Sequence, residues 1–121
     1  MITVEVSNLK NNIGIVQIAL YNKEGTIPDK AQNQYFLKKR VKPTDKQIRT
    51  TFKNLPKGRY AVSIFHDENN NGKIDKGFLL PEEGVGLSNF DSIDFLHLPN
   101  FKSASFELDK DTIVPVKIHY L

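Results

Sequence analysis

Apolar and polar residues alternate along most of this chain, which is the period of a β-strand that buries one face. The clearest example is the first stretch, where Ile2, Val4 and Val6 alternate with polar neighbours. Turn-forming residues separate the alternating stretches at intervals of about 8–12 residues. Seven strands are therefore predicted, over residues 2–7, 13–21, 35–41, 47–54, 59–65, 104–108 and 112–121.

Three details of this pattern predict how the strands are placed. The first two strands are expected to pair as a hairpin across Asn11 and Asn12. Residues 59–65 carry apolar side chains on both faces, so this strand is expected to be central. Pro115 cannot donate a backbone hydrogen bond, which favours an edge or a bulge in the last strand.

The segments between the strands show no clear period. Residues 26–34, 81–89 and 90–101 are predicted as loops, the last of them packed over the core. Seven short strands without a long helix predict an all-β fold, an antiparallel β-sandwich of the immunoglobulin or transthyretin (prealbumin) kind, with a barrel as the runner-up. The 121 residues fit a single domain spanning 1–121.

The composition excludes several kinds of function. Without cysteine, the chain has no disulfide, thiolate zinc site or cysteine nucleophile. No apolar run approaches the roughly 20 residues that cross a bilayer, so the protein is not expected to be membrane-spanning. The net charge is +3, but the densest basic run, Lys38-Lys39-Arg40, is short and is interpreted as a solvated or protective strand edge. Nucleic-acid binding is therefore not expected. The domain is also expected to be a monomer.

One stretch, residues 66–75, carries the spacing of a calcium-binding loop. Counted from Asp67, side-chain oxygens fall at loop positions one, three, five and nine, and Gly72 occupies position six, where the chain must turn sharply. Calcium takes about six to eight oxygen ligands, and alternate residues of a tight loop point inward. The predicted ligands are the side chains of Asp67, Asn69, Asn71 and Asp75 and the backbone carbonyl of Lys73.

This stretch differs from an EF-hand at its end and in its flanks. Position twelve is Phe78 instead of a bidentate glutamate, and a strand precedes the loop where an EF-hand has a helix. Glu82 and Glu83 follow closely enough to complete the ligand set, and His66 is a further candidate ligand or a residue that braces the loop. The alternative is a polar turn without metal, because Asp, Asn and Gly are common in all turns.

Three segments resemble successive signature blocks of one bacterial family. They are residues 55–62 (LPKGRYAV), 66–75 (HDENNNGKID) and 81–89 (PEEGVGLSN). Together with residues 9–21, residues 101–104 and Tyr120, they make essentially the whole chain similar to domain-of-unknown-function family 2141. The resemblance implies a small bacterial β-sandwich protein that is exported to the periplasm, the outer membrane or the exterior. Met1 leads directly into a strand, so the sequence predicts either a cytosolic protein or one whose export signal has been removed. The resemblance implies the second of these.

Three functions fit these residues. The first is a non-catalytic domain, stabilised by calcium, with a structural or interaction role in the cell envelope. The alternative is a carbohydrate- or peptide-binding module with an unidentified protein or glycan partner, which would use exposed aromatic side chains. Its candidates are Tyr21, Tyr35, Phe78 and Phe90. The third is a hydrolase using His66 and Asp67 with Ser88, but no nucleophile elbow or metal-hydrolase motif is present, so catalysis is not expected.

Overall fold

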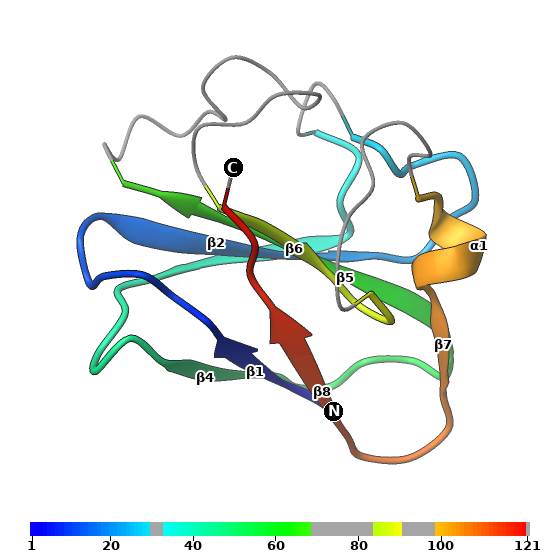
Figure 1. Ribbon diagram of the computed structural model, residues 1–121. Helices are drawn as coiled ribbons and strands as arrows, with labels where there is room; N and C mark the ends of the chain where they lie inside the picture. The colour runs from blue at the N-terminus through cyan, green and yellow to red at the C-terminus, as the bar shows by residue number, and fades with distance from the viewer. Residues whose placement is uncertain (30–32, 69–83, 91–98, 121) are drawn as a thin grey trace.

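The structure is a computed structural model that describes residues 1–29, 33–68, 84–90 and 99–120. Within these ranges the chain forms eight strands and one four-residue helix (Figure 1). The elements are β1 (Ile2–Ser7), β2 (Ile15–Tyr21), β3 (Leu37–Val41), β4 (Ile48–Phe52), β5 (Gly58–Asp67), β6 (Val85–Leu87), α1 (Phe101–Ala104), β7 (Phe106–Leu108) and β8 (Thr112–Lys117). The all-β class predicted from the alternating pattern is confirmed.

The strands form two sheets that lie one above the other (Figure 1). One sheet has three strands in the order β4-β1-β8. The other has the order β3-β2-β5-β6, and β7 pairs with the first residues of β5. The named strands pair in antiparallel fashion except β1 and β8, which run parallel. The structure is therefore a two-sheet sandwich in which the first and last strands lie side by side.

The predicted hairpin between the first two strands is wrong. β1 belongs to the three-stranded sheet and β2 to the five-stranded sheet. The connection between them, residues 8–14, crosses from one sheet to the other, with Asn8 and Gly14 at φ angles of 70° and 72°. Alternation along a strand specifies which face is buried, but it does not specify which strand lies alongside.

The space between the sheets holds the main hydrophobic core. On β2 and β5, the inward side chains of Ile18, Leu20, Val62 and Ile64 are at most 1% exposed. They pack against inward residues of β1, β4 and β8. β5 is paired on both sides and buried on both faces, so its predicted central position is confirmed. β8 is an edge strand, in agreement with the interpretation of Pro115.

A second, smaller hydrophobic cluster covers the outer face of the five-stranded sheet. Its members are Ala19, Tyr21, Ile27, Ala61, Leu87, Phe101 and Ala104. α1 contributes the last two residues, and its first turn is capped by Asn100, whose Oδ1 accepts the Ser103 N–H at 2.9 Å. β6 falls within the segment predicted as a loop over 81–89, and α1 lies between the loop predicted over 90–101 and the strand predicted from residue 104, overlapping each by one residue. Neither element was predicted, because elements of three or four residues are too short to show a period. The strand predicted over 104–108 begins later, because Ala104 is helical.

Candidate functional site

The central strand β5 ends at the first residues of the predicted calcium loop. It places His66 and Asp67 at one end of the sandwich, against the β1–β2 connection. The other predicted ligands lie outside the described residues, namely Asn69, Asn71, Lys73, Asp75, Glu82 and Glu83. In the part of the chain that the structure describes, no group of three or more His, Cys, Asp or Glu side chains could hold a metal ion. The described residues therefore show only the start of the predicted loop, His66, Asp67 and Glu68.

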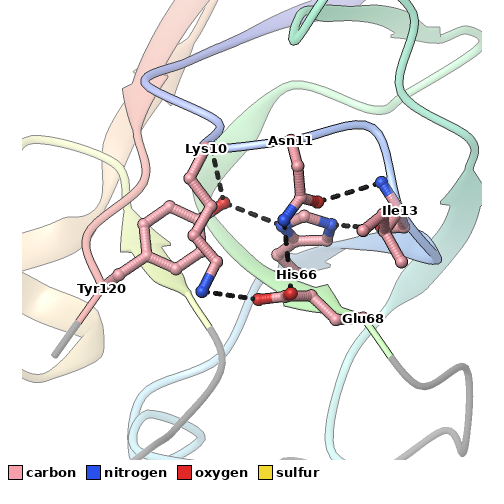
Figure 2. A network of polar contacts seen from close by, with 6 residues as sticks. All are labelled: Lys10, Asn11, Ile13, His66, Glu68 and Tyr120. Carbon is pink, nitrogen blue, oxygen red and sulfur yellow. Dashed lines mark hydrogen bonds and ion pairs between the residues drawn. The ribbon is translucent and has the colours of Figure 1, made fainter.

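His66 is completely buried, and both of its ring nitrogens are hydrogen-bonded (Figure 2). Nε2 lies 2.5 Å from the carbonyl oxygen of Ile13, and Nδ1 lies 2.7 Å from the hydroxyl of Tyr120. A carbonyl oxygen can only accept, so Nε2 carries the hydrogen in this bond. With that tautomer, Nδ1 accepts from the Tyr120 hydroxyl. The imidazole thus joins β5 to the β1–β2 connection and to the C-terminal segment.

Tyr120 extends this network to the first residues of the β1–β2 connection. Its hydroxyl accepts the backbone N–H of Lys10 at 3.3 Å, and its ring meets the His66 ring edge to face at a centroid distance of 5.9 Å. The Lys10 ammonium lies 4.9 Å from the centre of the Tyr120 ring, within the range of a cation–π contact. Burial raises the pKa of the Tyr120 phenol, and the nearby Glu68 carboxylate adds to that, while the Lys10 N–H opposes it.

Glu68 holds the same connection from the other side. Its carboxylate forms an ion pair with Lys10 at 3.0 Å and accepts a hydrogen bond from Asn11 Nδ2 at 3.3 Å. Asn11 Oδ1 in turn accepts the N–H of Ile13 at 2.9 Å. Burial acts to raise the pKa of Glu68, but the hydrogen bonds from Lys10 and Asn11 and the charge of Lys10 outweigh it, so the pKa is lowered.

Asp67 points to the opposite face of the sheet from His66, because consecutive side chains of a strand alternate. It is also completely buried, and its Oδ2 lies 3.1 Å from Nη2 of Arg40 on β3. The Arg40 guanidinium also donates to Gln17 Oε1 at 2.9 Å, on the strand between β3 and β5. A buried carboxylate requires a cation or several donors beside it, and the arginine supplies that charge.

Two glycines allow neighbouring segments to pack closely against the end of β5 and against Tyr120. Gly14 has a positive φ of 72°, and a Cβ there would lie 2.2 Å from the carbonyl oxygen of Asp67. At Gly84, a Cβ would lie 2.5 Å from the ring of Tyr120. The Gly84 carbonyl accepts the N–H of His66 at 2.8 Å. Both positions therefore need a residue without a side chain.

Sequence reasoning singled out His66 and Asp67 but missed their partners. In the sequence, Tyr120 shares the alternating phase of Val116 and Ile118 and forms part of the family resemblance, and Arg40 belongs to the short basic run interpreted as a solvated or protective strand edge. The inward phase of Tyr120 was the available signal, because a tyrosine that points into a core needs a partner for its hydroxyl. The Arg40 pairing had no comparable signal in the sequence.

Ser88, the hydroxyl of the hydrolase hypothesis, lies in a separate network on the outer face of the sheet. It is completely buried, its Oγ accepts the N–H of Val62 at 2.9 Å, and its hydroxyl donates to the carbonyl of Ala104 at 2.7 Å. Both hydrogen-bonding roles of the hydroxyl are therefore used. The described contacts do not bring Ser88, His66 and Asp67 together in a hydrogen-bonded series.

A second buried carboxylate, Asp29, also lies on the outer face. Its Oδ2 accepts the Tyr21 hydroxyl at 2.8 Å and the Gln34 N–H at 2.9 Å, and its Oδ1 accepts the Asn33 N–H at 3.2 Å. Burial, followed by the hydrogen bond and the negative charge of Asp29, raises the pKa of Tyr21. A small cavity beside this network has mainly apolar walls and the polar side chains of Gln17 and Ser63.

Fold and site together define a class, a small two-sheet β-domain with a closed polar network under the end of its central strand. The chain belongs to the DUF2141 family, described as "Uncharacterized protein conserved in bacteria", whose model matches residues 4–115. The family resemblance read from the sequence is confirmed. Searches of curated proteins and of solved structures found no significant match. None of the helices that the structure describes has the length and apolar character needed to cross a membrane.

Proposed function

We propose that this protein is a non-catalytic, exported β-sandwich domain with an interaction role in the cell envelope, in which residues 67–75 bind calcium. The observation that carries this proposal is the position of Asp67. The first residue of a stretch with calcium-loop spacing lies at the fixed end of the central strand. A cation bound there would restrain the long segment that follows it in the sequence.

Asp67 already faces one positive charge, the Arg40 guanidinium. A carboxylate has two oxygens and about four acceptor positions, so it can receive an arginine hydrogen bond and also ligate a metal. We therefore assign Asp67 two tasks, holding the start of the loop and supplying one ligand. Asp75 would supply the second carboxylate, and amide and carbonyl oxygens the rest.

Thermal unfolding in calcium and in EDTA tests this proposal. At a free calcium concentration about 100 times the Kd, binding to the folded state alone adds about 2.7 kcal/mol to the free energy of unfolding. A rise in Tm of several degrees is expected, and Asp75→Asn should abolish the rise without changing the Tm in EDTA. Asp109→Asn, in an exposed turn, is the matched control and should keep the rise. An identical Tm in millimolar calcium and EDTA would contradict calcium binding.

The proposal that the domain is non-catalytic is supported by the state of its candidate catalytic groups. A general base must reach a substrate proton, but both nitrogens of His66 are already bonded to the protein. The Ser88 hydroxyl is likewise buried and doubly bonded. A panel of esterase, glycosidase and phosphatase substrates should therefore show no turnover, and turnover abolished by His66→Gln would contradict the proposal.

Export is supported by the resemblance of this chain to its family, which implies an exported protein whose signal peptide has been removed. Expression of the protein from its own gene, followed by cell fractionation, tests it. The chain should be recovered outside the cytoplasm, in the periplasmic, outer-membrane or secreted fraction. Recovery with a cytoplasmic marker enzyme would contradict this part of the proposal.

A carbohydrate- or peptide-binding module remains the second candidate. The cavity beside Asp29, with Gln17 and Ser63 in its lining, has the apolar walls and few polar groups of a ligand site, but its volume of about 40 Å³ would admit only one small group of a ligand. Of the aromatic residues expected to bind such a ligand, Tyr21 is buried, and Tyr35 and Phe90 pack against the outer cluster. Phe78 lies outside the described residues. A glycan and peptide array compared between the wild type and Gln17→Ala tests this candidate.

A further inference from the structure

The positive charge of this protein is concentrated in one part of the chain. Residues 36–59 contain nine Lys and Arg side chains and a single Asp, a net charge of +8. Because the whole chain carries +3, the remaining residues carry −5. The modest total therefore conceals a strong asymmetry between one segment and the rest.

The fold places this segment along one side of the sandwich. β3 is an edge strand of the five-stranded sheet, and β4 is an edge strand of the three-stranded sheet. The two edges lie next to each other, since the Lys39 ammonium on β3 donates to the carbonyl of Thr51 on β4 and lies 4.9 Å from the Phe52 ring. A shallow groove between the strands is lined by Leu37, Lys38, Lys39, Thr51, Phe52 and Lys53.

Five exposed lysines on this side have no acidic partner among the described residues. We call them the basic edge, and they are Lys38, Lys39, Lys42, Lys46 and Lys53. In contrast, Arg40 and Arg49 in the same segment form ion pairs with Asp67 and Glu5. Lysine on an edge strand protects against pairing with other strands, which accounts for the lysines of β3. It does not account for Lys42 and Lys46, which follow the strand.

Exposed apolar side chains lie at both ends of the basic edge. At one end, Phe36 and Leu37 are 42% and 39% exposed. At the other end, Ile13 is 59% exposed. Its neighbour Asn12 accepts the Lys46 N–H at 2.6 Å and lies 3.5 Å from the Lys42 ammonium. The surface therefore combines unpaired positive charge with apolar side chains that water does not favour.

We propose that the basic edge docks this domain on an anionic membrane surface. Lysines are attracted to anionic headgroups, and exposed apolar side chains gain by entering the boundary between headgroups and acyl chains. A soluble polyanion would use the lysines but leave Phe36, Leu37 and Ile13 in water. Single-stranded nucleic acid needs a series of exposed ring faces for stacking. Ammonium groups lie over the rings of Tyr35 and Phe52, which leaves the exposed Phe36 without a neighbouring ring face to continue such a series.

This inference depends on the proposed interaction role but not on the calcium loop. Docking through lysines requires no metal, so it should persist in EDTA. The thermal test for calcium and the vesicle test for docking can therefore fail independently of each other.

Co-sedimentation with vesicles in EDTA at low salt tests the proposal. The protein should bind phosphatidylcholine vesicles that contain about 30 mol% phosphatidylglycerol, and should not bind vesicles of phosphatidylcholine alone. Each lysine near such a surface contributes about fivefold to the partition coefficient. The triple variant Lys38→Gln, Lys42→Gln and Lys53→Gln should therefore bind about a hundredfold more weakly.

A second triple variant with the same net charge is the matched control. Lys102→Gln, Lys110→Gln and Lys117→Gln replaces exposed lysines outside residues 36–59 and should bind as the wild type does. The double variant Ile13→Ser and Leu37→Ser, which keeps every charge, should bind anionic vesicles severalfold more weakly. Unchanged thermal unfolding in EDTA establishes that each variant is folded.

Three outcomes would overturn the proposal. The first is no binding to anionic vesicles. The second is an equal loss of binding in both triple variants, which would indicate net charge rather than a surface. The third is binding to dextran sulfate as tight as to the vesicles, together with no effect of the Ile13→Ser and Leu37→Ser variant. That result would assign the basic edge to a soluble polyanion.

Discussion

The two buried polar networks of this domain, around His66 and around Asp29, differ in how far apart their partners lie along the chain. His66 is bonded to Ile13 and Tyr120, which are 53 and 54 residues away. Asp29 is bonded to residues only 8, 4 and 5 positions away. The first network can form only when β5, the β1–β2 connection and the C-terminal segment have come together. The second can form within one loop and the strand before it.

This difference indicates different roles in stability. A group whose partners come from distant segments loses all of them together when the fold opens, and each lost partner leaves a buried polar atom unpaired. A local network can keep part of its bonds while its surroundings rearrange. We therefore expect changes around His66 to lower the stability of the whole domain and changes around Asp29 to have smaller effects.

The largest difference is expected between two glycines with a positive φ, Gly14 beside the His66 network and Gly25 in the turn after β2. Gly14→Ala combines a φ of 72° with a Cβ only 2.2 Å from the Asp67 carbonyl oxygen. Backbone strain and overpacking together predict a loss of about 3 kcal/mol or more in the free energy of unfolding. Urea unfolding monitored by circular dichroism measures this loss.

Gly25→Ala is the control for strain without crowding. Gly25 has a similar φ of 79°, but nothing lies within 4 Å of a Cβ at that position. The expected loss is about 1 kcal/mol, from the left-handed conformation alone. Equal losses in the two variants would show that the close approach of Gly14 to β5 does not contribute.

The next largest difference is expected between the two tyrosines. Tyr120→Phe removes the hydrogen bond to His66 Nδ1 and leaves that buried nitrogen without its partner, which predicts a loss of about 2 kcal/mol. Tyr21→Phe leaves the Asp29 carboxylate with two backbone N–H donors, which predicts a loss of about 1 kcal/mol. Denaturant midpoints of both variants check the order, and a larger loss for Tyr21→Phe would reverse our ranking of the networks.

These contrasts also explain how much of the fold the sequence could predict. The buried faces of β2 and β5 follow from alternation, because residues such as Ile18 and Ile64 repeat every second position. The parallel neighbour of β1 and the crossing of residues 8–14 depend on how the two sheets close, and no local pattern encodes that closure. The all-β class was therefore predictable, whereas strand adjacency was not.

The same limit applies to the candidate site. His66 and Asp67 could be singled out because they stand next to each other at the start of a spaced motif. Their partners could not, since Tyr120 is distant in sequence and Arg40 reaches Asp67 across the intervening strand β2. The charge asymmetry of residues 36–59 was visible in the sequence, but β3 and β4 had to be placed side by side before it could be interpreted as a surface.

At alkaline pH, the tyrosines of the two networks should lower the stability of the domain to different extents. Burial raises the pKa of both Tyr21 and Tyr120, so each contributes stability that is fully present below the unfolded pKa of 10.0. That stability is lost as the pH rises above this value, because the unfolded phenol ionises first. For each phenol that stays protonated in the folded state, the free energy of unfolding falls by up to about 1.4 kcal/mol per pH unit.

The raised pKa of Tyr21 also has contributions from the hydrogen bond to Asp29 and from its negative charge, so the decline in stability caused by Tyr21 should continue to a higher pH. Tyr21→Phe is therefore expected to flatten the decline in stability above pH 10 more than Tyr120→Phe does. Denaturant unfolding at several values between pH 9 and pH 11.5, in steps of about half a unit, measures both slopes. Equal slopes in the two variants would contradict the assignment.

The smallest effect is expected at the ion pair between Lys10 and Glu68, which joins the His66 network to solvent. The pKa of Glu68 is lowered, so its contribution is present above the unfolded pKa of about 4.5 and is lost as the pH falls through the folded value. The Lys10 side chain is 49% exposed, so solvent screens the pair. Glu68→Gln should therefore cost less than about 1 kcal/mol at pH 7, and the cost should shrink as the pH falls through the folded pKa of Glu68.

Glu5→Gln provides the comparison, because the pair of Glu5 with Arg49 is exposed on both sides and belongs to neither network. Its expected cost at pH 7 is close to zero. Added salt should reduce the cost of Glu68→Gln toward that of Glu5→Gln, since screening weakens an exposed ion pair but not the hydrogen bond from Asn11. A cost of Glu68→Gln that is independent of both pH and salt would assign its effect to packing against the β1–β2 connection instead of to charge.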